Sequence, residues 1–286
     1  MRIGIIGAEN THTVAIGNMI NVQHLIKGCS ADYVWGETAR FAKTAAQQGG
    51  IRHIVQKPAD MLGKVDAVVV DHRHPKYHLS AVLPFVKKGI PTFVDKPFCY
   101  RAAKGKEFLK IARRHKTPVT SHSALPLQQS YKKFVGKMKK IGRILGGVTY
   151  GPCDIRDPNG GIFFYGIHQV DMILNAFGAN VAAVQVTKRG KNATAQVMYP
   201  DGAIVVMHCI KEGLGNFYMT AIGEKDLIHS LIAFDKHMHL PGTRRFVQMF
   251  KTGQEPLSHA DILKPVQVLE ALEKSVKSGQ IEKVER

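Results

Sequence analysis

The stretch Arg2-Ile-Gly-Ile-Ile-Gly-Ala-Glu-Asn-Thr-His-Thr13 (RIGIIGAENTHT) decides the fold of the first half of the chain. Its apolar start predicts a buried strand, and Gly7 predicts the tight turn that leads from such a strand into a helix. In the G-x-G-x-x-G fingerprint of dinucleotide-binding folds, two further glycines let the backbone approach a pyrophosphate and let helix and strand pack closely. Glu9 and His12 stand at those two places. This stretch alone is as consistent with an ordinary strand-to-helix turn as with an altered phosphate site.

An altered site would still have the amino end of the helix, where backbone N–H groups bind anions. Side chains of the turn could add a cap, hydroxyl donors and, from a histidine, positive charge. The residues expected to line the site are Gly7, Ala8, Asn10, Thr11 and His12.

The first 122 residues alternate strand-like and helix-like segments. Alternation of this kind predicts a parallel sheet with helices on both faces, and ligands then bind at the carboxyl ends of the strands. We therefore expect a doubly wound α/β domain of the Rossmann type over residues 1–122. The apolar runs expected to form its strands are 2–7, 31–35, 51–55, 65–70, 90–94 and 117–120.

The second half of the chain is richer in strand-like segments that are separated by turn signals. Residues 193–210 and 216–232 are examples, and helix-like segments lie at 165–178 and 260–279. This pattern predicts an α+β domain over residues 123–286, built on an open, mainly antiparallel sheet with helices on one face. A substrate-binding and oligomerisation role is expected for it.

The composition limits the classes of function. The chain has 286 residues, with 40 Lys and Arg against 22 Asp and Glu, a formal net charge of +18. Such an excess permits an anionic partner, but the densest basic segment, 131–145, has helical apolar spacing, which favours a solvated helix face over a nucleic-acid surface. No apolar run approaches a membrane span, and four scattered cysteines form no CxxC pair. We expect a cytoplasmic protein with no metal, no membrane contact and no nucleic-acid partner.

The end of the second strand, VWGETAR (34–40), bears on the choice of nucleotide. If Glu37 turns into the site, its carboxylate would hold the adenosine ribose hydroxyls and favour NAD. If Thr38 and Arg40 face the site instead, a 2′-phosphate and therefore NADP would fit. A third interpretation, that Glu37 only caps the next helix, is nearly as good.

A polar loop, Asp71 to His78, follows the fourth strand. Its histidines and carboxylate include metal-ligand types, but their spacing matches no standard metal site and Arg73 stands among them. A loop over the ligand crevice, with His72 and His78 near the cofactor, is the favoured interpretation.

The strongest signal combines two segments. Asp95-Lys96-Pro97 ends the fifth strand, so Lys96 is expected over the crevice. His168 and Asp171 are three residues apart on an expected helix and therefore share a face. A lysine, a histidine and a carboxylate that meet at a crevice make a plausible set for proton transfer.

At these residues the sequence resembles the Gfo/Idh/MocA oxidoreductases over nearly the whole chain. Asp95-Lys96-Pro97 is similar to the family's E-K-P motif and residues 166–171 (GIHQVD) to its G-x-H-x-x-D motif. Gly160-Gly161, PKYH (75–78) and YPDGAIVVMHC (199–209) also resemble family segments. The chain departs from the pattern at Glu9 and His12, and at Phe164, where an acidic residue is usual.

The resemblance implies a Rossmann domain, bound NAD or NADP, and hydride transfer at a hydroxyl-bearing carbon of a sugar- or cyclitol-like substrate. It implies that Asp95 and Lys96 contact the cofactor, that Lys96 also contacts the substrate hydroxyl, that His168 is the general acid/base, and that Asp171 orients His168 or the substrate. It implies a homodimer or homotetramer. The histidines and arginines around the crevice suggest an anionic group on the substrate. The alternatives are a catalytically silent nucleotide-binding or regulatory protein of the same fold and, from the net charge, a polyanion binder.

Overall fold

The computed structural model describes residues 1–213 and 215–285, which form two compact units. Unit 1 comprises Met1–His122 and His239–Ile262, and unit 2 comprises Ser123–Met238 and Leu263–Arg286. Residues 239–262, which the sequence placed with the second half, therefore pack with the first. The physical reason is apolar: Phe246 stacks on Phe93 with ring centroids 4.4 Å apart, and Val247, Met249 and Phe250 join the same core.

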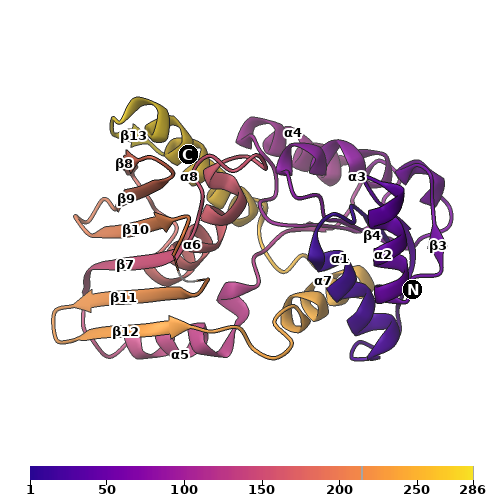
Figure 1. Ribbon diagram of the computed structural model, residues 1–286, viewed down its shortest axis with the longest axis horizontal. Coiled ribbons are helices and arrows are strands. Elements are labelled where there is room, and N and C mark those ends of the chain that lie inside the picture. Colours follow the sequence, from indigo (N-terminus) through magenta and orange to yellow (C-terminus); the bar gives the residue numbers. More distant parts are fainter. Residues whose placement is uncertain (214, 286) are drawn as a thin grey trace. The chain divides into compact units, whose positions relative to one another are not determined.

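Unit 1, which contains the N-terminus marked in Figure 1, is built on a six-stranded parallel sheet with the strand order β3-β2-β1-β4-β5-β6. Its strands are β1 (Arg2–Ile6), β2 (Ser30–Trp35), β3 (His53–Ile54), β4 (Ala67–Val70), β5 (Thr92–Val94) and β6 (Val119–Thr120). The central strands β1 and β4 are buried almost throughout, as parallel strands covered on both faces are. The Rossmann-type sheet expected from the alternating pattern is confirmed.

Most helices of unit 1 pack in pairs beside this sheet. The helices are α1 (Thr11–Gly17), which continues as a π-helical turn over Asn18–Val22, α2 (Ala39–Gly49), α3 (His78–Val86), α4 (Ala102–Arg114) and α7 (Leu240–Thr252). Helices α1 and α2 pack on one another, as do α3 and α4. Because β1, β4 and β5 are parallel, the loops that carry Ala8, Asp71 and Asp95 all leave the same edge of the sheet.

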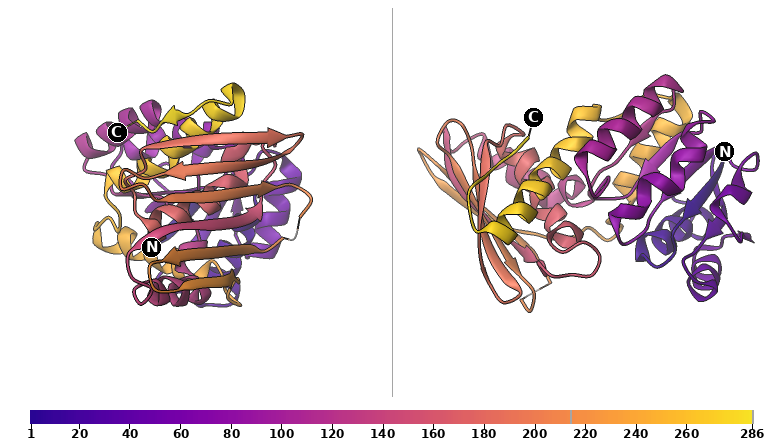
Figure 2. Two further views of the ribbon diagram at one scale, coloured as in Figure 1. Left: turned by 90° about the vertical axis from the view of Figure 1, so that its left-hand side faces the viewer. Right: turned by 90° about the horizontal axis from the view of Figure 1, so that it is seen from above.

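Unit 2 is built on a seven-stranded sheet, seen face-on in the left view of Figure 2, with the order β12-β11-β7-β10-β9-β8-β13. Every neighbouring pair is antiparallel except β7 and β10. This confirms an open, mainly antiparallel sheet. Its strands are β7 (Ile144–Pro152), β8 (Ala183–Arg189), β9 (Asn192–Met198), β10 (Ile204–Ile210), β11 (Phe217–Gly223), β12 (Leu227–Ile232) and β13 (Glu282–Lys283).

One face of this sheet is covered by helices α5 (Gln129–Met138), α6 (Ile162–Phe177) and α8 (His259–Ser278). Burial alternates along β9, β10 and β11, so the side chains of the other face stay partly exposed. The basic helix is shorter than the segment 131–145 over which it was expected. It ends at Met138, because Gly142 adopts a left-handed turn (φ +82°) and Ile144 already begins β7.

Candidate cofactor and catalytic site

The turn between β1 and α1 requires the one fingerprint glycine that the chain retains. Gly7 has φ +105°, and a Cβ at this position would lie 2.7 Å from the backbone carbon of Asp71. Its N–H donates to the carbonyl of Trp35 at 3.0 Å. Close packing of three strand ends therefore excludes any side chain at this position.

The carboxylate of Glu37 lies against this turn. Its Oε2 accepts hydrogen bonds from the N–H groups of Ala8 and Glu9, both at 2.9 Å. Its Oε1 is buried and has no hydrogen-bond partner among the described residues. Helix α2 is capped by Thr38, whose hydroxyl accepts from the N–H of Phe41 at 3.2 Å, so Glu37 does not serve as that cap. A buried acceptor atom is thus presented next to the turn.

The other residues of the turn face in different directions. The Glu9 carboxylate lies 4.0 Å from a guanidinium nitrogen of Arg73, which offsets its negative charge. Asn10 is the N-cap of α1, and its oxygen accepts from the N–H of His12 at 3.4 Å. Thr11 is exposed, and so is Arg40 on α2. The positive charge nearest the Glu9 carboxylate therefore comes from the loop after β4.

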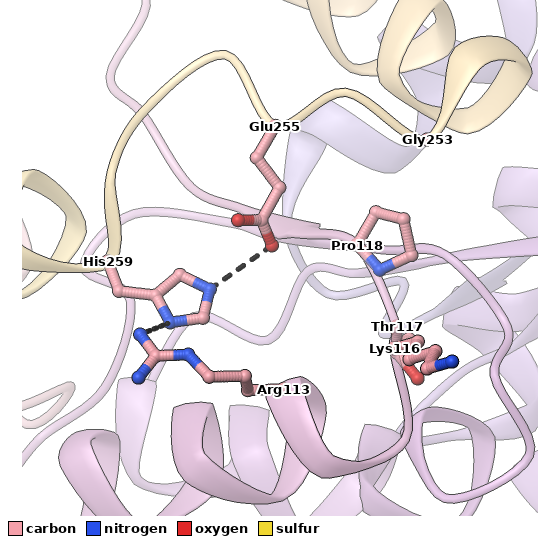
Figure 3. A pocket seen from close by; sticks show the side chains of 7 residues that line it. All are labelled: Arg113, Lys116, Thr117, Pro118, Gly253, Glu255 and His259. Atoms are coloured by element: carbon pink, nitrogen blue, oxygen red, sulfur yellow. Dashed lines mark hydrogen bonds and ion pairs between the residues drawn. The ribbon is translucent and has the colours of Figure 1, made fainter.

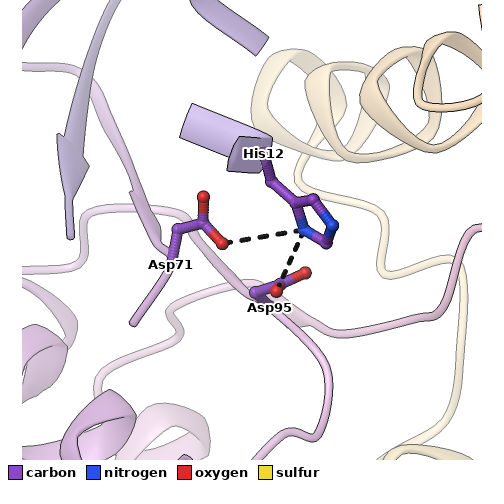
Figure 4. A group of neighbouring side chains, drawn as sticks. All are labelled: His12, Asp71 and Asp95. Atoms are coloured by element: carbon purple, nitrogen blue, oxygen red, sulfur yellow. Dashed lines mark hydrogen bonds and ion pairs between the residues drawn. The ribbon is translucent and has the colours of Figure 1, made fainter. Parts of the chain in front are cut away.

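Two buried carboxylates and a histidine converge at the carboxyl ends of β4 and β5 (Figure 4). His12 Nδ1 lies 3.2 Å from Asp95 Oδ2 and 3.7 Å from Asp71 Oδ1. The Asn10 amide donates to Asp71 Oδ1 at 2.7 Å and reaches Asp95 Oδ2 at 3.3 Å. The hydroxyl of Thr13 lies 2.7 Å from Asp71 Oδ2. We call His12, Asp71 and Asp95 the His12 cluster.

The two carboxylates of this cluster differ in charge. Burial, and then the charge of Asp95, raise the pKa of Asp71 well above its usual value. Burial would also raise the pKa of Asp95, but His12 and Lys96 together outweigh that effect and hold it well below the usual range. The proton that two close, buried carboxylates share therefore belongs to Asp71, and the negative charge to Asp95.

The His12 cluster also contains metal-ligand types, whose ligand atoms lie within 4.8 Å of one another. Its oxygens already accept hydrogen bonds from Asn10 and Thr13, and Lys96 Nζ lies 3.8 Å from Asp95 Oδ2. A metal ion would have to displace the amide and bind beside an ammonium group. The cluster is better explained as a hydrogen-bonded network around Lys96.

Lys96 lies on the loop after β5, and His78 holds this loop by a contact with the carbonyl of Pro97. The side chain of Lys96 is largely buried. His78 is fully buried, with Nδ1 3.0 Å from the carbonyl of Pro97 and Nε2 2.8 Å from that of His72. It thereby joins the loops that follow β4 and β5. The ring of His72 in turn lies 5.7 Å from that of Trp35.

Helix α6 of unit 2 carries the second part of the expected catalytic set. The described helix includes both His168 and Asp171, and Asp171 is buried. His168 Nδ1 lies 2.9 Å from the hydroxyl of Ser123, and the His168 ring meets those of Tyr165 and Phe217 edge-on at 5.6 Å each. Lys96 belongs to unit 1, so its joint action with His168 and Asp171 stays a prediction.

Sequence reasoning assigned no site role to three residues of these networks. Asp71 follows a buried strand directly, as Asp95 does, and that shared position was the available signal. Ser123 comes shortly after β6, in a segment that carries no motif. The ring of His239 lies beside that of His12, with ring centroids 4.5 Å apart and the planes tilted by 54°. It had no local signal, because its segment joins unit 1 only through tertiary packing.

A pocket of about 350 Å³ lies at the opposite, amino edge of the unit 1 sheet (Figure 3). Glu255 Oε1 accepts from the N–H of Val119 at 2.8 Å and lies 3.1 Å from His259 Nε2. His259 Nδ1 is 3.4 Å from an Arg113 nitrogen. These contacts tie the segment after α7 to the start of β6.

Residues 1–123 match the sequence model described as "Oxidoreductase family, NAD-binding Rossmann fold", the Gfo/Idh/MocA family. Residues 1–123 are a Gfo/Idh/MocA NAD-binding domain. For these residues the family expected from the sequence motifs is confirmed, and so is a nicotinamide dinucleotide as the cofactor.

Solved structures resemble this chain over its whole length. Scyllo-inositol dehydrogenase from Lactobacillus casei, in its apo form, has a TM-score of 0.85 at 15% identity, covering 99% of this chain and 98% of that one. The same enzyme with NAD(H) and scyllo-inositol has a TM-score of 0.83 at 16% identity, over 99% of both chains. Myo-inositol 2-dehydrogenase from Lactobacillus plantarum has a TM-score of 0.84 at 16% identity, over 100% and 99%. No protein with a curated description matches the chain in sequence.

The residues of unit 1 fit a nicotinamide dinucleotide. Oε1 of Glu37, which is buried and has no partner in the described part of the chain, is an acceptor suited to a ribose hydroxyl. Gly7 keeps the backbone turn at the start of α1 in the form that approaches phosphate groups. None of the described helices is long and apolar enough to cross a membrane.

Proposed function

We propose that this protein is a Gfo/Idh/MocA oxidoreductase, an NAD-dependent dehydrogenase acting on a hydroxyl-bearing carbon of a small polyhydroxylated, sugar- or cyclitol-like substrate. The observation that carries the choice of NAD is the position of Glu37. Its carboxylate is fixed by two backbone N–H groups and leaves one buried oxygen for a ribose hydroxyl. A 2′-phosphate at that place would meet a carboxylate and be repelled.

The remaining cofactor contacts are proposed for the turn and for the two strand-end loops. Gly7, Ala8 and Thr11 lie at the amino end of α1. The side chains of Asn10 and His12 are turned to the buried carboxylates, so they act by shaping the turn. His72 and His78 hold the loop after β4, and Asp95 lies beside Lys96.

The chemistry assigns one task to each catalytic residue. The nicotinamide, when bound, supplies the hydride acceptor or donor. His168 takes the proton of the substrate hydroxyl, because imidazole titrates near working pH. The ammonium group of Lys96 stabilises the negative charge that develops on the substrate oxygen. Asp171, buried on the same helix as His168, positions the substrate or the histidine.

The substrate class follows the family and is supported by the inositol dehydrogenases with the same fold. An anionic group on the substrate stays a prediction, since Arg73 already has Glu9 beside it. A homo-oligomer formed through the open face of the unit 2 sheet is also proposed. That face exposes Ile222, Leu227 and Leu231.

The first test is cofactor binding. Trp35, the single tryptophan of the chain, ends β2 immediately before Gly36 and Glu37, so its emission should report NADH at the turn. We expect saturable NADH binding and much weaker NADPH binding. Glu37→Ala should weaken NADH binding by at least about tenfold, the loss typical for a hydrogen bond to a charged group. Lys43→Ala, which removes an exposed cation from the following helix α2, is the matched control.

Turnover is tested next on a panel of inositols and sugars, with Lys96→Ala and His168→Ala as variants. Full activity in either variant would refute the assigned mechanism. Absence of NADH and NADPH binding, checked by calorimetry, would refute the oxidoreductase function as a whole.

A second candidate is a nucleotide-binding regulatory protein without catalysis. Glu9 and His12 in the fingerprint and the buried, apolar Phe164 on α6 favour it. Stoichiometric NADH binding together with no turnover of any alcohol or ketone on a broad panel would support this function over the dehydrogenase.

A further inference from the structure

We propose that Ser123 is the positioning residue for His168: its hydroxyl accepts the Nδ1 proton and leaves Nε2 as the nitrogen that exchanges protons with the substrate. This inference rests on the proposed function, because it gives His168 the role of acid/base. Ser123 lies in the segment between β6 and α5, whereas His168 lies on α6, 45 residues further along the chain.

The serine side chain is held in place before it meets the histidine. Ser123 is 2% exposed, and its Oγ lies 3.4 Å from the N–H of Leu125, which donates to it. Leu125 itself is fully buried in the core of unit 2. The hydroxyl oxygen is therefore anchored to a rigid turn, so it can hold the His168 ring in one place.

The imidazole of His168 is also held from its sides. Tyr165, one turn earlier on α6, meets it edge-on at an interplanar angle of 68°. Phe217 on β11 meets it at 70°, and that phenylalanine is almost fully buried. Rotating the ring to exchange its nitrogens would break both contacts and the bond to Ser123. The ring nitrogen that faces away from Ser123 is thus fixed as Nε2.

A hydroxyl suits this task because it accepts a hydrogen bond without carrying charge. With Nδ1–H donated to Ser123, the lone pair of neutral His168 is on Nε2. When the substrate is oxidised, its O–H bond breaks and an Nε2–H bond forms. The electron pair left on oxygen forms the carbonyl as the hydride passes from the carbon to the oxidised nicotinamide. The Nδ1–H···Oγ bond is kept throughout, so the ring need not reorient.

Two other hydroxyl–histidine pairs in unit 2 show what a purely structural contact looks like. Thr220 Oγ1 lies 2.9 Å from His229 Nδ1, and Thr194 Oγ1 lies 3.1 Å from His208 Nδ1. Both pairs join directly opposite residues of neighbouring antiparallel strands. Ser123, by contrast, is buried and connects a loop to a helix. The atom pair is the same in all three cases, which makes the threonines matched controls.

The decisive measurement is nitrogen NMR of the full-length protein with labelled histidine, with the His168 signals assigned from His168→Gln. We expect neutral His168 to carry its proton on Nδ1 in the wild-type protein. Ser123→Ala should change the Nδ1 signal and the balance of the two tautomers, and Ser123→Thr should restore both. Thr220→Val should change only the signal of His229.

The kinetic counterpart separates positioning from binding. Ser123→Ala should lower kcat by about tenfold, the loss expected for one hydrogen bond to a charged ring, with KM unchanged within about twofold. Ser123→Thr should recover most of kcat. A wild-type His168 protonated on Nε2, or a kcat for Ser123→Ala equal to wild type, would overturn the proposal.

Failure of the proposed function gives a different result. If the wild-type NMR signals are as expected but no substrate is turned over, the dehydrogenase function is wrong and Ser123 has no catalytic process to serve. The tautomer of wild-type His168 is measured without a substrate and without a Ser123 variant. It therefore tests which ring nitrogen carries the proton, whether or not the dehydrogenase function is correct.

Discussion

Two histidine–carboxylate contacts lie at opposite edges of the unit 1 sheet. At the carboxyl edge, His12 Nδ1 is 3.2 Å from Asp95 and close to Asp71 (Figure 4). At the amino edge, His259 Nε2 is 3.1 Å from Glu255 (Figure 3). The distances are alike, so the contact itself does not distinguish a functional histidine from a structural one.

The surroundings distinguish them. Asp95 is almost completely buried, has Lys96 Nζ 3.8 Å away, and shares the Asn10 amide with a second carboxylate. Glu255 is partly exposed, and its oxygen also accepts from the backbone of Val119. Only the carboxyl edge gathers several charged groups out of water, at a cost in solvation that an active site commonly carries. The comparison indicates function at one edge and loop anchoring at the other.

The largest expected effect comes from Asp95→Asn. It removes the anion beside Lys96 and His12 while keeping the size of the side chain. We expect NAD-linked turnover to fall by roughly tenfold to a hundredfold, as for a lost hydrogen bond to a charged group. Steady-state kinetics on the best substrate checks this. Glu255→Gln, the control at the other edge, should leave turnover unchanged. Equal losses of turnover in Asp95→Asn and Glu255→Gln would show that the two edges of the sheet do not differ in function.

The second expected effect is loss of stability in acid. Burial lowers the pKa of His72 and His122 to about 4, and burial together with His12 lowers that of His239 to about 3. In the folded protein these histidines stay neutral down to about pH 4. In the unfolded chain they bind protons once the pH falls below the ordinary histidine pKa of 6.5. Stability is therefore present above that value and is lost as pH falls toward 4. His122 alone should contribute about 2 kcal/mol to the loss between pH 8 and pH 5.

Urea unfolding at several pH values measures this dependence. His122→Gln is the informative variant, because the Nδ1 atom of His122 is buried and has no partner among the described residues. The variant should show a shallower loss of stability over the same pH range. A slope identical to that of the wild-type protein would contradict the assignment of His122 as a buried neutral histidine.

The smallest expected effect is at the amino edge. Glu255→Ala leaves the N–H of Val119 without its side-chain acceptor and should lower the free energy of unfolding by about 1 to 2 kcal/mol. Glu255→Gln should restore most of this, because the amide oxygen still accepts. Thermal unfolding compares the two variants. If Glu255→Ala lowered turnover and left the free energy of unfolding unchanged, the pocket of Figure 3 would have a functional role.

The sequence by itself determined the Rossmann strands, the open sheet and the two segments with Lys96 and His168. These follow from local patterns: apolar runs of strand length, turn residues between them, and short motifs at strand ends and on one helix. It also left three arrangements open for Glu37, because the direction of a side chain after a strand depends on which backbone N–H groups come near it. Ala8 and Glu9, far earlier in the chain, provide those groups.

Only the tertiary structure decided the partners. His12 looked like a cation for a phosphate, yet its ring faces Asp71 and Asp95, which are brought beside it by the order β1-β4-β5. Ser123 meets His168 through packing that no periodicity encodes. Residues 239–262 join unit 1 because Phe246 fits against Phe93. Burial raises the pKa of both carboxylates, and the neighbouring charges of His12 and Lys96 then decide that Asp71 holds the proton.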